Sequence, residues 1–90
     1  MSSSAPWRVE LTRAAQRDLR RLDPPVRVRV ADSLRTLAEN PHRSGALRKL
    51  TGAPEWRLRI GEWRALVLLD VDTQTIVVTR VLPRGRAYRD

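Results

Sequence analysis

Cationic and bulky apolar side chains alternate in the segment Trp56-Arg57-Leu58-Arg59-Ile60, at the period of a β-strand. Successive side chains of a strand point to opposite faces, so the apolar residues would share one face and Arg57 and Arg59 the other. The two guanidinium groups would then stand about 7 Å apart on a rigid element. Because arginine can pair with phosphate through two parallel hydrogen bonds, this spacing predicts a platform for a phosphate-bearing ligand.

Further basic residues flank this segment or follow the last apolar run. Arg64 comes directly after the Gly61-Glu62-Trp63 connection, and Arg84 follows Pro83. Antiparallel pairing would bring both to the platform, because neighbouring strands return beside one another. The alternative interpretation is that these arginines are solvated and protect exposed sheet edges, which is the ordinary role of basic residues on strands.

Most familiar catalytic signatures are missing from the chain. It has one histidine and no cysteine, so we expect neither a Ser-His-Asp set nor a zinc site. It also lacks a glycine-rich phosphate loop. We therefore expect no metal and no cofactor, and any chemistry would have to rely on positive charge and positioning.

The first half of the chain predicts one short strand and two helices. Residues 7–11 alternate as a strand, and Thr12 can cap a helix over residues 13–22. Asp23-Pro24 supplies the start of a second helix that continues to about Glu39, where Asn40-Pro41 stops it. The two helices should be antiparallel neighbours.

The second half predicts β-structure. Strands are expected over residues 55–60, 63–70 and 75–82, with a brief strand at 47–50. The strand at 63–70 is apolar on both faces and should be central. This order predicts an α+β fold in which two N-terminal helices pack on one face of a mainly antiparallel sheet. Residues 1–90 should form one domain, with a disordered start at 1–6 and a basic tail at 84–90.

Charge and composition limit the partners. The chain has 90 residues, with 18 basic against 10 acidic side chains and a formal net charge of +8. Such a balance favours polyanions such as nucleic acid, and arginine, which accounts for every basic residue except Lys49, suits contacts with phosphates and bases. A GC-rich coding sequence would also favour arginine. No apolar run approaches the length of a membrane span, so we expect a cytoplasmic protein without a membrane partner.

Several blocks stand in a familiar order along the chain. They are Ala-x-x-Asp-Leu-x-x-Leu at residues 15–22, Asn40-Pro41, Leu47-x-x-Leu50-x-Gly52, the block from Trp56 to Arg64, and the closing Arg84-Gly-Arg-Ala-Tyr-Arg89. Over nearly the whole chain they resemble the RelE/ParE superfamily of bacterial type II toxins. The resemblance implies the RelE-like toxin fold and, in the RelE branch, a ribosome-dependent endoribonuclease that cuts mRNA without a metal.

The resemblance also implies roles for individual residues. Arg64 and Arg84 would stabilise the phosphorane charge, and Arg57 and Arg59 would orient the RNA backbone and support the transition state. Tyr88 would stack on a base or move a proton. Further contacts with the substrate would come from Arg48, Lys49 and Arg86.

The chain departs from the superfamily at two places. Some RelE members carry lysine at the positions of Arg57 and Arg59, and a histidine often stands where Pro83 stands here. Arginine holds its proton too tightly to be a good base, so proton removal would fall to Tyr88, Glu62 or the ribosome.

The implied partners are a cognate antitoxin, the ribosome with mRNA, and operator DNA only through the antitoxin. Two other functions stay open at this point. One is ParE-like inhibition of DNA gyrase on the same fold, and the other is RNA binding without catalysis.

Overall fold

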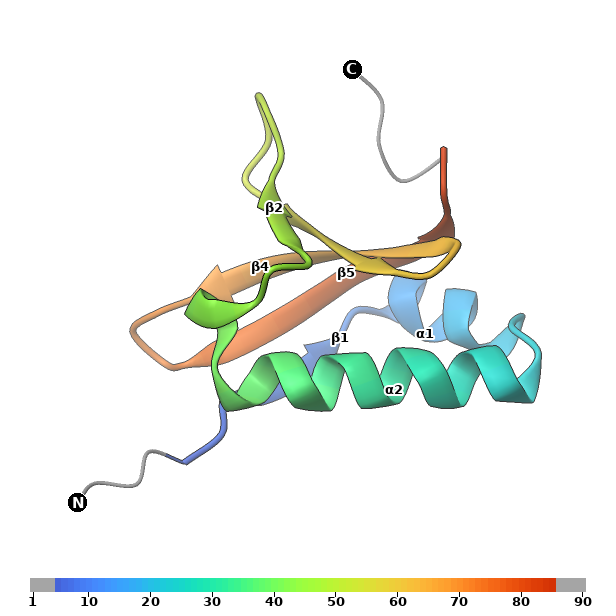
Figure 1. Cartoon of the computed structure of the whole chain (residues 1–90), viewed down its shortest axis with the longest axis horizontal. Coiled ribbons are helices and arrows are strands. Elements are labelled where there is room, and N and C mark those ends of the chain that lie inside the picture. The colour runs from blue at the N-terminus through green and yellow to red at the C-terminus, as the bar shows by residue number, and fades with distance from the viewer. Residues whose placement is uncertain (1–4, 86–90) are drawn as a thin grey trace.

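The structure is a computed structural model, and it describes residues 5–85. One layer holds two helices and the other a five-stranded sheet, as Figure 1 shows. The elements follow one another as β1 (Arg8–Leu11), α1 (Arg13–Arg20), α2 (Pro24–Glu39), the 3-10 helix η1 (Pro41–Arg43), β2 (Leu47–Lys49), β3 (Trp56–Ile60), β4 (Trp63–Asp70) and β5 (Thr75–Pro83). The predicted α+β arrangement is confirmed.

The sheet has the strand order β1-β5-β4-β3-β2, so β4 is central, as its apolar sequence predicted. β1 runs parallel to β5, and every other neighbouring pair is antiparallel. A bulge between Leu66 and Val67 shifts the register of β4 against β5. Several boundaries differ from the prediction by one or two residues: α1 ends at Arg20 instead of residue 22, β1 and β3 each start one residue later, and β5 includes Pro83.

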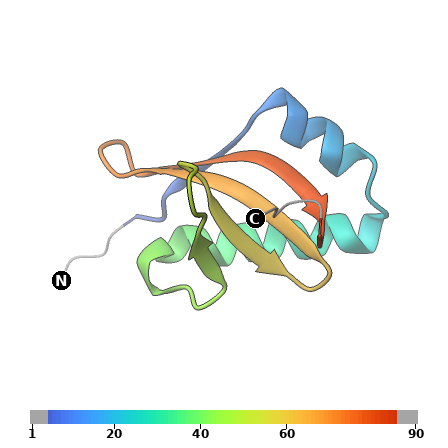
Figure 2. The same cartoon turned by 90° about the horizontal axis from the view of Figure 1, so that it is seen from above.

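The core lies between α2 and the sheet. Val30, Leu34 and Leu37 of α2 are buried against Val67 and Ile76 of the central strands. Figure 2 shows α2 beneath the sheet, and no helix in residues 5–85 covers the opposite face. Side chains that point to this second face are therefore available to a partner.

The helix α1 closes the edge that β5 exposes beyond β1. Thr12 caps α1 by accepting a hydrogen bond from the Ala15 N–H (3.1 Å) and donates its hydroxyl proton to the carbonyl of Thr79 (2.9 Å). Asp18 accepts a hydrogen bond from the Val81 N–H at 2.8 Å. These contacts satisfy backbone groups that an open sheet edge would leave unpaired.

Candidate functional site

Three of the predicted arginines lie on the uncovered face of the sheet, on the neighbouring strands β3 and β4. Arg59 of β3 is directly opposite Arg64 of β4, and Arg57 is opposite Leu66. Directly opposite residues of antiparallel strands have Cβ atoms about 4.5–5.5 Å apart, so like charges there repel. We call Arg57, Arg59 and Arg64, together with Arg84 just beyond β5, the arginine face.

The charges of the other three members of the arginine face act on the guanidinium of Arg64. Burial lowers the pKa of the Arg64 guanidinium, and the positive charges of Arg84, Arg57 and Arg59 lower it further. Glu62 opposes this shift as the last and smallest contribution. An anion bound among these groups would relieve their repulsion, so the arrangement is suited to a phosphate.

The turn between β3 and β4 fixes the position of Arg64 and Arg84. Gly61 has a φ of 59°, in the left-handed region that favours glycine. Arg64 donates from Nη1 to the carbonyls of Gly61 and Trp63, at 2.8 Å each. The Arg84 N–H donates to the Glu62 carbonyl at 2.8 Å, and its Nη1 lies 4.0 Å from Glu62 Oε1. Backbone contacts therefore bring the end of β5 to the turn that precedes Arg64.

The predicted substrate contacts are distributed unequally. Arg48 lies opposite Arg57 and shares its face of the sheet, whereas Lys49 lies opposite Trp56 and shares the other face. The Lys49 ammonium is 5.7 Å from the centre of the Trp56 ring and donates to the carbonyls of Ala53 and Pro54, at 3.3 and 3.4 Å. The structure therefore does not bring Lys49 together with the arginine face. Arg86 and Tyr88 lie outside the described residues.

Arg80 is a residue near this face that the sequence analysis did not single out. Its Nε and Nη2 donate to the two carboxylate oxygens of Asp18, at 2.8 and 3.1 Å. Burial of Asp18 raises the pKa of its carboxyl, but the hydrogen bonds from Arg80 and Val81 and the charges of Arg80 and Arg21 lower that pKa below its ordinary value. Asp18 falls on the apolar stripe of α1 between Ala15 and Leu22, and a carboxylate there needs a cation. That pattern could have indicated a buried ion pair.

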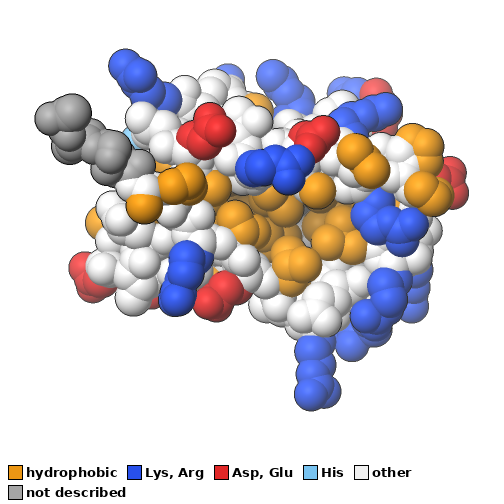
Figure 3. All heavy atoms as spheres, turned by 90° about the horizontal axis from the view of Figure 1, so that it is seen from below, with side chains coloured by type: hydrophobic (Ala, Val, Ile, Leu, Met, Phe, Trp, Pro, Cys, Tyr) orange, Lys and Arg blue, Asp and Glu red, His pale blue; other side chains and the backbone are white. Residues whose placement is uncertain are grey.

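Two hollows lie away from the arginine face. The first, which we call the α1–α2 groove, has a volume of about 580 Å³. Its apolar lining includes Trp7, Val9, Leu19, Val30, Ala31 and Leu34, and its charged lining residues are Arg27, Arg35 and Glu39. Figure 3 shows apolar side chains gathered in a hollow, with both basic and acidic side chains around them.

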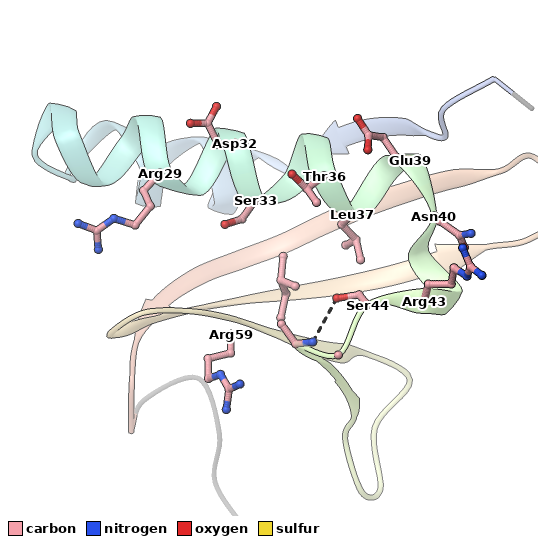
Figure 4. Close-up of a pocket in the computed structure, with 13 residues that line it drawn as sticks. Arg29, Asp32, Ser33, Thr36, Leu37, Glu39, Asn40, Arg43, Ser44 and Arg59 are labelled. Carbon is pink, nitrogen blue, oxygen red and sulfur yellow. Dashed lines mark hydrogen bonds between the residues drawn. The ribbon is translucent and has the colours of Figure 1, made fainter.

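The second hollow, the α2–β3 groove, has a volume of about 570 Å³ and lies between α2 and the outer edge of β3. Figure 4 shows the residues that line it. Its lining is mainly polar on the side of α2. Within residues 5–85, no group of acidic and histidine side chains could hold a metal ion. None of the helices in that same range is long and apolar enough to cross a membrane.

The fold is similar to that of several solved RelE toxin structures. A chain of the toxin–antitoxin complex RelBE2 from Mycobacterium tuberculosis superposes with a TM-score of 0.81 and 29% identity, over 92% of this chain and 97% of that one. For the archaeal RelE–RelB complex from Pyrococcus horikoshii the TM-score is 0.78, with 22% identity over 91% and 99% of the two chains. The isolated RelE toxin of E. coli gives a TM-score of 0.75 and 17% identity, over 89% and 86%.

Sequence comparison identifies the family. The family model described as the ParE toxin of the type II toxin–antitoxin system parDE matches residues 9–88. This chain therefore belongs to the ParE toxin family, within the RelE/ParE superfamily of type II toxins. A search of curated proteins found no similar sequence.

Proposed function

We propose that this toxin is an endoribonuclease that cuts mRNA on the ribosome. The observation that supports the proposal is the arginine face, where burial and the charges of Arg84, Arg57 and Arg59 lower the pKa of Arg64. A group of cations that repel one another on an uncovered face gains most from an anion that carries concentrated negative charge. The transition state of phosphodiester cleavage is such an anion.

The reaction needs little covalent chemistry from the protein. RNA supplies its own nucleophile, because the ribose 2′-hydroxyl can attack the adjacent phosphorus. The bond from O2′ to phosphorus forms as the bond from phosphorus to O5′ breaks, which leaves a 2′,3′-cyclic phosphate and a 5′-hydroxyl. The 2′-hydroxyl gives its proton to a base, and the departing O5′ receives one. DNA lacks this hydroxyl and should not be cut.

The four arginines would divide the remaining tasks. Arg64 and Arg84 would stabilise the charge on the pentacoordinate phosphorus, and Arg57 and Arg59 would hold the RNA backbone in line for attack. Arginine stays protonated at neutral pH and cannot be the base. That role would fall to Tyr88, to Glu62 or to a group of the ribosome, and Tyr88 is also suited to stacking on a base.

We also propose that a cognate antitoxin binds this toxin in the cytoplasm. In the resulting complex, the antitoxin would make the contacts with operator DNA. The structures similar to this chain include complexes of RelE with RelB. The α1–α2 groove offers an apolar surface with two arginines, Arg27 and Arg35, and one carboxylate, Glu39, in its lining. The apolar surface and the excess of basic residues suit an amphipathic segment with acidic flanks.

Paired substitutions on α2 test this docking surface. Ala31 lines the α1–α2 groove, whereas Val28 is exposed and lies outside it. We expect Ala31→Glu to abolish protection of cells by the co-expressed antitoxin, and Val28→Glu to preserve it. Equal protection from both variants would exclude this groove as the antitoxin site.

Inhibition of DNA gyrase is the second candidate function, and the match to the ParE family model favours it. Brief induction of the toxin in cells, with transcript 5′ ends mapped and gyrase–DNA adducts assayed in parallel, separates the two. New 5′ ends within translated regions support cleavage. Adducts with intact transcripts would overturn the nuclease proposal and favour the gyrase function. If neither new 5′ ends nor adducts form, RNA binding without catalysis would be favoured.

A further inference from the structure

The α2–β3 groove and the arginine face share Arg59, which lies on the outer side of β3. β2 pairs with β3 only through residues 47–49, and beyond that pairing the Arg59 N–H donates to the Ala46 carbonyl at 3.0 Å. Arg59 lines the mouth of the groove, and Figure 4 shows its side chain directed away from α2. A ligand that lies across the arginine face could therefore continue past Arg59 into the groove.

The lining of the groove combines charge, hydrogen-bonding groups and an apolar base. Arg29 and Arg43 lie toward opposite ends of it, as Figure 4 shows. Ser33 and Thr36 present hydroxyl groups from α2, while Leu37 contributes apolar surface. Two carboxylates also belong to the lining. One of them, Asp32, forms an ion pair with Arg35, and the other is Glu39.

Gly61 brings one end of the groove close to Arg64. Arg29 Nη1 lies 3.3 Å from the position that a Cβ atom would occupy on Gly61, so a side chain there would crowd it. On the same residue, the carbonyl oxygen accepts the hydrogen bond from Arg64 at 2.8 Å. Gly61 thus lies next to one cation of the groove and one cation of the arginine face.

We propose that the α2–β3 groove binds the nucleotides of single-stranded RNA that flank the cleaved linkage. This inference rests on the proposed nuclease function and adds a second binding site to it. The groove volume of about 570 Å³ lies within the range of about 300–1,000 Å³ that is typical of ligand sites. Arg29 and Arg43 would contact phosphates, and the hydroxyl groups of Ser33 and Thr36 would bind ribose or base edges.

Binding of labelled RNA to the purified toxin tests the inference. The probes are single-stranded RNAs of about four and about twelve nucleotides, 2′-O-methylated so that they are not cut, of which the longer can reach from the arginine face into the groove. The test variant combines Arg29→Ala with Arg43→Ala, and the control combines Arg17→Ala with Arg20→Ala, which removes two exposed cations from α1.

The two variants should behave differently. For the groove variant we expect about tenfold weaker binding of the long RNA and a salt slope smaller by about 1.4, while binding of the short RNA changes by less than about twofold. The control should bind both RNAs like the wild type. Far-UV circular dichroism verifies that both variants fold.

Other outcomes would overturn the inference. They are wild-type binding of the long RNA by the groove variant, an equal loss in the control, or no binding of RNA by the wild type. A ribosome cleavage assay on the same proteins keeps the two proposals apart. If the groove variant cleaves mRNA and still binds the long RNA like the wild type, the groove proposal is rejected and the nuclease proposal stands. If the groove variant loses binding as predicted but the wild type cleaves nothing, only the nuclease proposal is rejected.

Discussion

Arg80 and Arg64 occupy neighbouring strands of one sheet, yet their surroundings are opposite. Arg80 donates two hydrogen bonds to Asp18, and this partner raises the pKa of its guanidinium. Arg64 is partly buried among Arg57, Arg59 and Arg84, and its pKa is lowered. The first environment has already neutralised its cation, while the second needs an external anion to do so.

This contrast distinguishes arginines that contribute to folding from those that we propose bind a ligand, in a chain where arginine is abundant. A cation whose charge is already paired with a carboxylate contributes to folding and has little left for a ligand. A cation held among like charges costs stability and is retained where binding requires it. Substitutions in the two regions should therefore affect different measurements.

The largest effect is expected from Arg64→Ala. Loss of one preorganised charge at the phosphorane should lower kcat for mRNA cleavage on ribosomes by roughly 10²–10³-fold. Because this change removes repulsion from the arginine face, the urea midpoint should stay the same or rise. Arg13→Ala on α1 is the control and should retain full activity. A kcat within about threefold of the wild type for Arg64→Ala would contradict the proposed role.

The next largest effect is on stability and comes from the other region. Asp18→Asn removes the carboxylate that binds Arg80 and the Val81 N–H. Breaking a buried pair costs about 3–5 kcal/mol, and since the Arg80 side chain is 44% exposed we expect a loss of about 2–3 kcal/mol in the free energy of unfolding. Urea denaturation measures it. The kcat of the folded variant should stay near that of the wild type, and a large loss of kcat would remove the distinction between the two regions.

The ionisation of Asp18 gives this stability a pH dependence. Its pKa in the folded protein is lowered, while in the unfolded chain it should be about 3.9. The unfolded state therefore binds more protons as the pH falls, so the contribution is complete above about pH 5 and is lost progressively as the pH falls toward the lowered pKa of the folded protein. The difference in unfolding free energy between wild type and Asp18→Asn should be constant from about pH 5 to 8 and shrink in acid. A difference that grows in acid would have the wrong sign.

Local patterns were sufficient to predict the hairpin that carries most of the arginine face. The alternation from Trp56 to Ile60 and the glycine after it determine which side chains share a face and where the chain turns. Arg57, Arg59 and Arg64 come together for that reason, without information from distant segments. The two helices were predicted on the same local grounds, from caps and apolar spacing.

Long-range register could not be predicted in the same way. Asp18 and Arg80 are 62 residues apart, and nothing local to Asp18 selects one arginine among seventeen. The two grooves depend on how α2 sits against strands from both halves of the chain, which no single segment determines. Lys49 shows the same limit at short range, since its face depends on the pairing of the brief strand β2 with β3.

A smaller effect on stability is expected at the turn between β3 and β4, which lies next to both the α2–β3 groove and the arginine face. Gly61→Ala places a Cβ at a φ of 59° and 3.3 Å from the flexible end of Arg29, so it should cost about 1 kcal/mol. Gly45→Ala is the matched control, because a Cβ at Gly45 meets nothing within 4 Å and its φ is not positive. Equal urea midpoints for the two variants would show that the turn does not require glycine.

The smallest effects concern two neighbours on β2 that differ in the face they occupy. Arg48 shares the face of Arg57, so Arg48→Ala should raise the KM for cleavage by about three- to tenfold and leave kcat unchanged, as expected when uniform binding is lost. Lys49 belongs to the opposite face of the sheet and donates hydrogen bonds to the carbonyls of Ala53 and Pro54, so Lys49→Ala should change the KM by less than about twofold. The two variants remove the same charge from adjacent positions, and overall charge therefore cannot account for a difference between them. A larger rise in KM for Lys49→Ala than for Arg48→Ala would mean that the RNA does not lie on the arginine face.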